Sequence, residues 1–248
     1  MNELAGLAFV GLFAVLILGF AALSRWRNFR PAFREIRAFA VLPESLGHAV
    51  EAGKGLHLSL GSGGLGGSES AAAYVGLAML SRMAEMTGVS DQPPIVTSGN
   101  GITTILAQDT LRAIYARQNA EAQYEPTAAK MAGPTPMSYA AGAMAFAADE
   151  TVHVNVLAGS FEESGALIAH AATAGRRSLL AGSDRPQTQA LFYAVSDSPL
   201  IGEELYAGGA YLNAGPLHVS SLQTQDALRL VIAIALLAGA ALTALGRL

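Results

Sequence analysis

Residues 55–68 read Gly55-Leu56-His57-Leu58-Ser59-Leu60-Gly61-Ser62-Gly63-Gly64-Leu65-Gly66-Gly67-Ser68. Leucines alternate with polar residues as far as Leu60, which predicts a β-strand, and the glycines that follow predict a loop leading into a helix. At such a junction the first N–H groups of the helix are unpaired and the helix dipole favours negative charge, which suits an anionic group. We therefore expect this loop to be the centre of a ligand site.

The same order of strand, Gly/Ser pair and helix recurs three more times. Apolar runs at residues 95–97, 152–157 and 178–181 stop at Ser98-Gly99, Gly159-Ser160 and Gly182-Ser183, and helical patterns follow each of them. Strands that alternate with helices in this way favour βαβ units. The predicted fold class is α/β, with a mostly parallel sheet and helices on both of its faces.

The rest of the chain between the strands divides into helices and one long loop. Helices are expected at residues 69–87, 102–118, 136–148, 161–174, 187–195 and 200–212. Pro43 is expected to separate a helical connector from a short second helix that ends near residue 53. Residues 119–136 show no periodicity, which is typical of a lid or of a mobile loop.

The two ends of the chain are strongly apolar and are predicted to be transmembrane helices. The mean hydropathy is +0.37, and uncharged runs at residues 4–23 and 230–246 are long enough to cross a hydrocarbon core of roughly 30 Å. The predicted domains are a transmembrane helix at 1–24, a basic juxtamembrane connector at 25–53, an α/β domain at 54–226 and a second transmembrane helix at 227–248.

Charge near the first apolar run predicts the orientation of the chain. A cleaved signal peptide begins with basic residues, whereas here Glu3 precedes the run and five arginines follow it between residues 25 and 37. Basic residues stay on the cytoplasmic side, so we expect a two-helix protein of the cell membrane with its central domain in the cytoplasm.

Composition excludes several functions. Residues 38–226 hold 8 Lys and Arg against 17 Asp and Glu, and such an acidic body would repel the phosphate backbone of a nucleic acid. The absence of cysteine excludes disulfides and thiolate chemistry, and no spacing typical of metal ligands occurs. The expected partners are the lipid bilayer, a small anionic ligand and, because Ala235, Gly239 and Thr243 form a small-residue face on the second apolar run, other copies of the chain.

The glycine loop matches two nucleotide-binding motifs incompletely. Residues 61–66 satisfy G-x-G-x-x-G between a strand and a helix, but the next strand ends at Ser98 and not at the acidic residue that binds ribose in dinucleotide sites. As a P-loop, the segment has Gly67 in place of the lysine. The hypothesis that remains is a phosphate or other anion on the loop, and the alternative is a turn that needs glycine torsions.

Carboxyl ends of parallel strands meet at one edge of a sheet, where open α/β folds bind ligands. The predicted ligand-binding residues are Gly61, Ser62, Gly63, Gly66, Gly67, Ser68, Ser98, Asn100, Ser160 and Ser183. Glu162, Asp184 and Arg185 lie just beyond them. The alternative is that these serines and glycines form turns and helix caps.

Two classes of function follow from this edge. The first is a membrane-tethered cytoplasmic module that binds a small anionic ligand or assembles as a scaffold. The alternative is a hydrolase or transferase for a phosphorylated or acyl substrate, with His57 or Asp184 as base and Ser62, Ser98 or Ser160 as nucleophile or orienting hydroxyl. His57 is also suited to a hydrogen-bonded place in the interior, and the residues assign no cofactor.

Four blocks of sequence, at residues 46–61, 94–99, 106–112 and 200–212, resemble a family of prokaryotic membrane-anchored proteins known only as a domain of unknown function. The resemblance covers residues 40–225 and implies no activity or site. It directs attention to Glu203 and Glu204, which lie in the last block.

Overall fold

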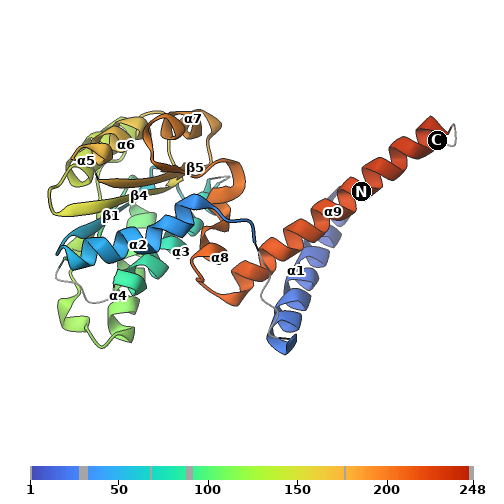
Figure 1. Cartoon of the computed structure of the whole chain (residues 1–248), viewed down its shortest axis with the longest axis horizontal. Coiled ribbons are helices and arrows are strands. Elements are labelled where there is room, and N and C mark those ends of the chain that lie inside the picture. The colour runs from blue at the N-terminus through green and yellow to red at the C-terminus, as the bar shows by residue number, and fades with distance from the viewer. Residues whose placement is uncertain (1, 28–32, 68, 88–91, 176, 246–248) are drawn as a thin grey trace. The chain divides into compact units, whose positions relative to one another are not determined.

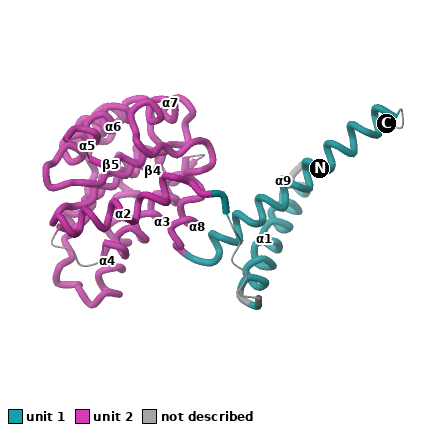
Figure 2. Tube along the Cα trace, viewed as in Figure 1, with its two compact units in different colours: residues 1–34, 215–248 teal, residues 35–214 magenta. Residues whose placement is uncertain are grey.

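The computed structural model describes residues 2–27, 33–67, 69–87, 92–175 and 177–245. The chain forms two compact units (Figure 2): a helical pair from residues 1–34 and 215–248, and a body from residues 35–214. The predicted boundaries at 53/54 and 226/227 differ from this division. Residues 35–53 belong to the body because they form a helix packed on the sheet, and residues 215–226 belong to the helical pair because they begin its second helix.

The body is built on six parallel strands (Figure 1), which confirms the predicted α/β class. In the order of the sheet they are β3 (Ala129–Met131), β2 (Ile95–Ser98), β1 (Gly55–Gly61), β4 (Val152–Ser160), β5 (Ser178–Ser183) and β6 (Ser198–Pro199). This is the doubly wound order of dinucleotide-binding folds, in which the chain turns back between β1 and β4. Ligands of such sheets bind at the carboxyl ends of the strands beside that switch point.

Helices cover both faces of the sheet, as predicted (Figure 1). One layer holds α2 (Arg37–Glu51), α3 (Ser70–Thr87) and α4 (Gly101–Arg117); the other holds α5 (Pro136–Ala147), α6 (Gly165–Thr173) and α7 (Pro186–Val195). The leucines of β1 pack towards α3, since a Cβ on Gly76 would lie 2.9 Å from Leu60 Cδ2. The opposite layer shares a core that includes Leu157, Phe161 and Phe192.

Pro43 does not end a helix, so the predicted break at this residue is wrong. It lies inside α2, and its ring removes one backbone hydrogen bond from the helix. The helix continues because a full apolar face is buried on the sheet, comprising Ala38, Phe39, Leu42, Leu46 and Ala49. Pro43 itself is exposed, which leaves this face intact.

The segment 119–136, expected to be a lid or a mobile loop because it lacks periodicity, contains regular structure. The segment contains two 3₁₀ turns, η1 (Glu121–Gln123) and η2 (Pro126–Ala128), and then strand β3. Gln108 Nε2 donates to the carbonyl oxygens of Pro126 at 3.2 Å and Ala129 at 2.9 Å, and Tyr124 donates to Gln108 O at 3.1 Å. These bonds hold the segment against α4 and leave it at the sheet edge.

The helix predicted at 200–212 is two shorter elements, η3 (Gly202–Ala207) and α8 (Gly208–Tyr211). Gly202 has a φ of +61°, so the chain turns at the first residue of η3. Gly208 packs closely on α3, because a Cβ there would lie 2.9 Å from Met79 Sδ, and Tyr211 stacks on Phe39 at 5.4 Å between ring centroids. Packing on α2 and α3 therefore sets the path of this segment.

The helical pair consists of α1 (Asn2–Arg27) and α9 (Pro216–Ala244), which pack against each other. Both helices are long and apolar enough to cross a membrane. Pro216 occupies the first turn of α9. Backbone N–H groups in the first turn have no hydrogen-bond acceptor within the helix, so a proline there costs no helical hydrogen bond. The polar segment at 218–226 and the second apolar run are thus one continuous helix.

Candidate functional site

The glycine loop is tied to β4 at the switch point of the sheet. Gly61 has a φ of +80°, and a Cβ on it would lie 2.1 Å from Ser160 O. The N–H groups of Ser62 and Gly63 donate to the same oxygen at 3.0 and 3.3 Å. Glycine is therefore required at Gly61 for the turn and for the close approach of β1 to β4.

The outer half of the loop is open. Gly66 and Gly67 are exposed, and a Cβ on either would meet nothing within 4 Å. Gly67 O accepts hydrogen bonds from Ser70 N at 3.2 Å and Ser70 Oγ at 2.6 Å, whereas the N–H groups of Gly66 and Gly67 have no partner within the described ranges. Ser68, the next predicted site residue, lies outside the described residues. The free donors here are those that an anion would use.

Ser98 and Asn100 close the turn between β2 and α4. Ser98 Oγ accepts from Asn100 N at 3.1 Å and donates to Asn100 O at 3.2 Å. Asn100 Oδ1 caps α4 by accepting from Ile102 N at 3.0 Å and Thr103 N at 3.3 Å. The Asn100 amide nitrogen is left facing the loop, 3.1 Å from where a Cβ on Gly64 would lie.

Ser183 performs a similar task after β5. Its Oγ accepts from Phe161 N and from Arg185 N, both at 3.2 Å, and so joins the ends of β4 and β5. Ser160 differs, because the residue is 2% exposed and its Oγ closes no such turn; among the described residues, the buried side-chain atoms without a hydrogen-bond partner are Thr103 Oγ1 and Gln223 Oε1. Ser160 Oγ lies 3.1 Å from the position of a Cβ on Gly63, as does Glu69 Oε2. Ligand binding by these residues stays a prediction.

One arginine lies among three carboxylates at this edge. Arg185 Nη2 donates to Glu69 Oε1, and Arg185 Nη1 lies 3.8 Å from Glu162 Oε1. The hydrogen bond to Glu69, followed by the charges of Glu69, Glu162 and Asp184, raises the pKa of Arg185. The guanidinium is therefore a permanent positive charge in a locally acidic setting.

Glu69 and Tyr206 were not among the site residues predicted from the sequence. Glu69 was the first residue of the predicted helix 69–87, and only the fold brings it to Arg185. Tyr206 in η3 is 39% exposed, and its pKa is raised by burial and by the charge of Asp184. A search for acidic residues directly after the glycine loop would have found Glu69, but no local pattern indicates Tyr206.

His57 lies in the interior of the sheet layer and not at the edge. Its Nδ1 is 2.9 Å from Asn155 Oδ1 and its Nε2 is 3.0 Å from Thr97 Oγ1. Asn155 Nδ2 donates to Ala147 O at 3.2 Å, so Oδ1 is the acceptor and the His57 proton is on Nδ1. Burial lowers the pKa of His57 to about 4, against the opposing effect of the hydrogen bond that His57 donates to Asn155 Oδ1. The interpretation as an interior hydrogen-bonded histidine is confirmed.

The remaining polar group beneath the loop is the Tyr139 hydroxyl, which the sequence did not single out. It accepts from Gly61 N at 3.0 Å and bonds to Ser59 Oγ at 2.5 Å. Burial raises the pKa of Tyr139 to about 12, so the hydroxyl remains neutral and connects α5 to the base of the loop.

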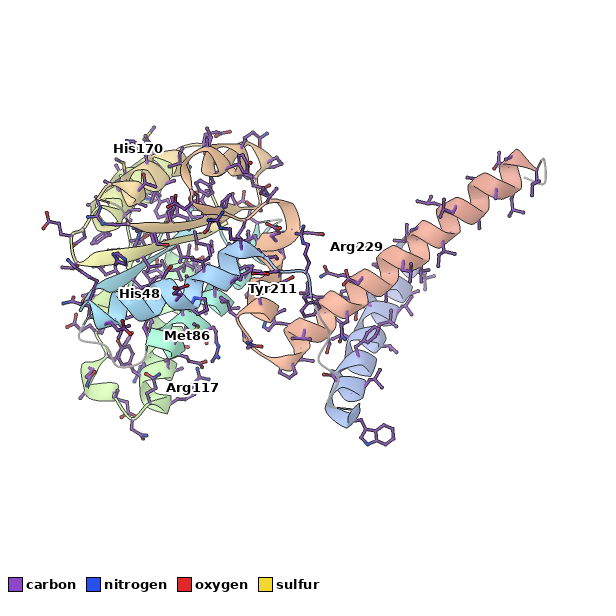
Figure 3. All side chains as sticks on the ribbon, viewed as in Figure 1. His48, Met86, Arg117, His170, Tyr211 and Arg229 are labelled. Carbon is purple, nitrogen blue, oxygen red and sulfur yellow. The ribbon has the colours of Figure 1, made fainter. Side chains whose placement is uncertain are left out.

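Two further histidines of the body do not join this edge. His48 and His170 lie on the outer sides of α2 and α6 (Figure 3), and both are exposed. No group of three or more His, Cys, Asp or Glu suited to a metal ion occurs among the residues that the structure describes. Beside Glu162, an open groove of about 480 Å³ is lined by Pro136, Met137, Glu162, Glu163, Ser164 and Leu167.

A family model described as "Domain of unknown function (DUF6754)" matches residues 1–247. No curated protein and no solved structure matches the chain.

Proposed function

We propose a function for this chain, which belongs to the DUF6754 family of unknown function, from the geometry of its candidate site. It is a membrane-tethered module that binds a small ligand through an anionic group. The binding site is the edge formed by the glycine loop after β1, the end of β4 and the turn after β5.

The observation that carries this proposal is the ion pair between Arg185 and Glu69. The two residues are 116 positions apart and belong to the turns after β5 and β1, which the sheet order separates by β4. Their side chains are 40% and 34% exposed, so a ligand can reach them. An anionic group that replaced the Glu69 carboxylate would bond to the guanidinium and to the free N–H groups of Gly66 and Gly67.

The rival function, a hydrolase or transferase, has less support. It requires a serine hydroxyl beside a base, but His57 contacts Asn155 and Thr97, and its low pKa keeps it neutral. Within the described part of the chain, no serine Oγ is hydrogen-bonded to a histidine nitrogen. Ser98 uses its hydroxyl to close a turn. The Ser183 hydroxyl lies 3.4 Å from Asp184 Oδ1, the other base considered, and it also closes a turn by accepting from Arg185 N.

The first test is a thermal-unfolding screen of the full chain in detergent against nucleotides, inorganic phosphate and small carboxylates. A ligand at a hundredfold excess over its Kd stabilises by about 2.7 kcal/mol. Gly66→Asp adds a carboxylate where no atom lies within 4 Å, so it should abolish the stabilisation without disturbing the fold.

The matched control is Gly47→Asp, at an equally open position in α2. It should leave the ligand effect intact. A ligand that stabilises the Gly66→Asp protein as strongly as the unchanged chain binds somewhere else, and the proposed site is then wrong.

We further propose that the body lies in the cytoplasm and that copies of the chain associate in the membrane. The arginines between residues 25 and 37 support the orientation. For association, Ala235 and Thr243 are exposed on α9, and a Cβ on Gly239 would meet nothing within 4 Å, so α1 does not cover this face.

A further inference from the structure

We infer that a second copy of this chain docks on the exposed face of α4, with the two α4 helices packed against each other in antiparallel directions. The inference does not depend on the ligand site. It adds a contact between the bodies to the proposed association of copies through α9. It follows from the spacing of the exposed residues of α4 and from the way their charges and sizes match when the face is rotated onto itself.

The outer side of α4 carries one regular row of exposed residues. The helix lies at the end of its layer, beside α3, β2 and β3. The row consists of Ile102, Ile105, Asp109, Arg112 and Ala116. Its alternate spacing of three and four residues is that of the a and d positions of a coiled coil, and at 3.6 residues per turn it lies within an arc of about 80°. Such a row fits the corresponding row of another helix.

The first part of the row is apolar although it faces solvent. Ile102 and Ile105 are 61% and 65% exposed, whereas the opposite side of α4 is buried on the body. A single exposed isoleucine is ordinary on a protein surface, but two at successive positions of one helical row form a strip that a partner helix would cover. The last position of the row, Ala116, is small and leaves room for a large side chain.

The middle of the row carries opposite charges. Asp109 and Arg112 are exposed, and neither forms an ion pair with any residue that the structure describes. Arg117, which lies just outside the row, is by contrast paired with Glu85 at 2.7 Å. A helix that covered the row would therefore have to supply one positive and one negative group at matching positions.

A second copy of α4 supplies these groups. If two α4 helices pack antiparallel about a two-fold axis midway between positions 110 and 111, Asp109 faces the partner's Arg112, and Arg112 faces the partner's Asp109. In the same register Ile105 faces the partner's Ala116, so a large side chain meets a small one on each side of the axis. The face is thus complementary to itself in charge and in size, as a dimer interface with two-fold symmetry requires.

This contact is suited to copies that are already held in one membrane. A single pair of helices buries less than the roughly 800 Å² per partner of a standard interface, so the bodies alone would associate weakly. Both α1 and α9 are long and apolar enough to cross a membrane, and confinement of the copies to one plane would raise their effective concentration. The experiment therefore uses the full chain in membranes.

Cysteine cross-linking tests the antiparallel register, because the chain has no cysteine of its own. The double variant Ile105→Cys/Ala116→Cys should form a covalent dimer on mild oxidation, since each cysteine faces the other position on the partner. The two positions are about 16 Å apart along one helix, too far for a disulfide within the chain or between equal positions of two copies. Each single variant should therefore form at most about a tenth as much dimer.

Charge reversal tests the complementarity separately. Asp109→Arg and Arg112→Asp each place like charges opposite each other, and each should reduce the cross-link of the Ile105→Cys/Ala116→Cys chain by about fivefold or more. The exchange Asp109→Arg/Arg112→Asp restores both ion pairs and should restore the cross-link. Glu51→Arg, which makes the same kind of charge change at an exposed position on α2, is the matched control and should have no effect.

Thermal unfolding in detergent separates loss of the contact from loss of the fold. All of these positions are exposed, so each variant should unfold within about 2 °C of the unchanged chain. The inference is overturned if the double cysteine variant forms no more dimer than the single variants, or if the exchanged charges do not restore the cross-link. If Ala235→Cys on α9 still cross-links in that case, copies associate through the membrane helices alone and the α4 face is not an interface.

Discussion

His57 makes stability depend on pH. Its pKa is about 4 in the folded chain and 6.5 as a free side chain, so the unfolded state binds the extra proton between these values. The free energy of unfolding therefore keeps its full value above pH 6.5. It falls as the pH drops towards 4, by about 3 kcal/mol for a pKa shift of this size. Thermal unfolding of the full chain at pH 7, 5.5 and 4 measures the decline.

The comparison that identifies His57 as the cause uses two variants. His57→Gln should lower stability at pH 7 but flatten the decline, whereas His170→Gln, on the exposed side of α6, should leave the decline unchanged. An equally steep decline in the His57→Gln protein would assign the pH dependence to other groups.

For single residues, the direction in which a side chain of β1 points could be predicted from the sequence, but its hydrogen-bond partners could not. The alternation along β1 correctly predicted that His57 and Ser59 face away from the leucines. Their partners Asn155, Thr97 and Tyr139 lie on β4, β2 and α5, between 40 and 98 positions away. Such contacts depend on strand order and register, and no local spacing contains that information.

At the scale of elements, the testable feature is the small-residue face of α9. Gly239→Leu places a large side chain on it and should at least halve disulfide cross-linking between copies in membranes, since such faces act by close helix approach. The chain has no cysteine, so Ala235→Cys, one turn away on the same face, provides the reporter. Ala241→Leu, at an exposed position on the opposite side of α9, is the control. Unchanged cross-linking after Gly239→Leu would show that copies do not meet there.

Helices and strands could be predicted where the hydrophobic pattern extends over many residues. They could not be predicted where tertiary packing determines the secondary structure. The helices α3, α4, α5 and α7 lie within one residue of their predicted bounds, whereas α6 begins at Gly165, four residues later than predicted. Patterns and caps are local, as with Thr135, whose side chain accepts from Ser138 N ahead of Pro136. Strands β3 and β6 have three and two residues, too few to show alternation. Pro43 was misjudged because the buried face of α2 outweighs one lost hydrogen bond.

At the scale of the whole molecule, composition alone separated the apolar ends from the acidic body, and the repeated strand and helix order predicted a parallel sheet. Neither feature predicted the strand order β3-β2-β1-β4-β5-β6, which places the switch point beside the glycine loop. The ten predicted site residues were chosen by their place at strand ends. The charged pair that now defines the proposed site required the fold, because Glu69 and Arg185 meet only across the end of β4.

The orientation of the whole chain is the last prediction. Five arginines between residues 25 and 37 should retain the body in the cytoplasm, and the N-terminus should lie outside. A single cysteine at Glu121→Cys, an exposed position in η1, should resist a membrane-impermeant maleimide in whole cells and react after lysis. Asn2→Cys should react in whole cells. The opposite labelling pattern would place the body outside the membrane, where it would meet extracellular and not cytoplasmic ligands, and would assign the arginines no role in orientation.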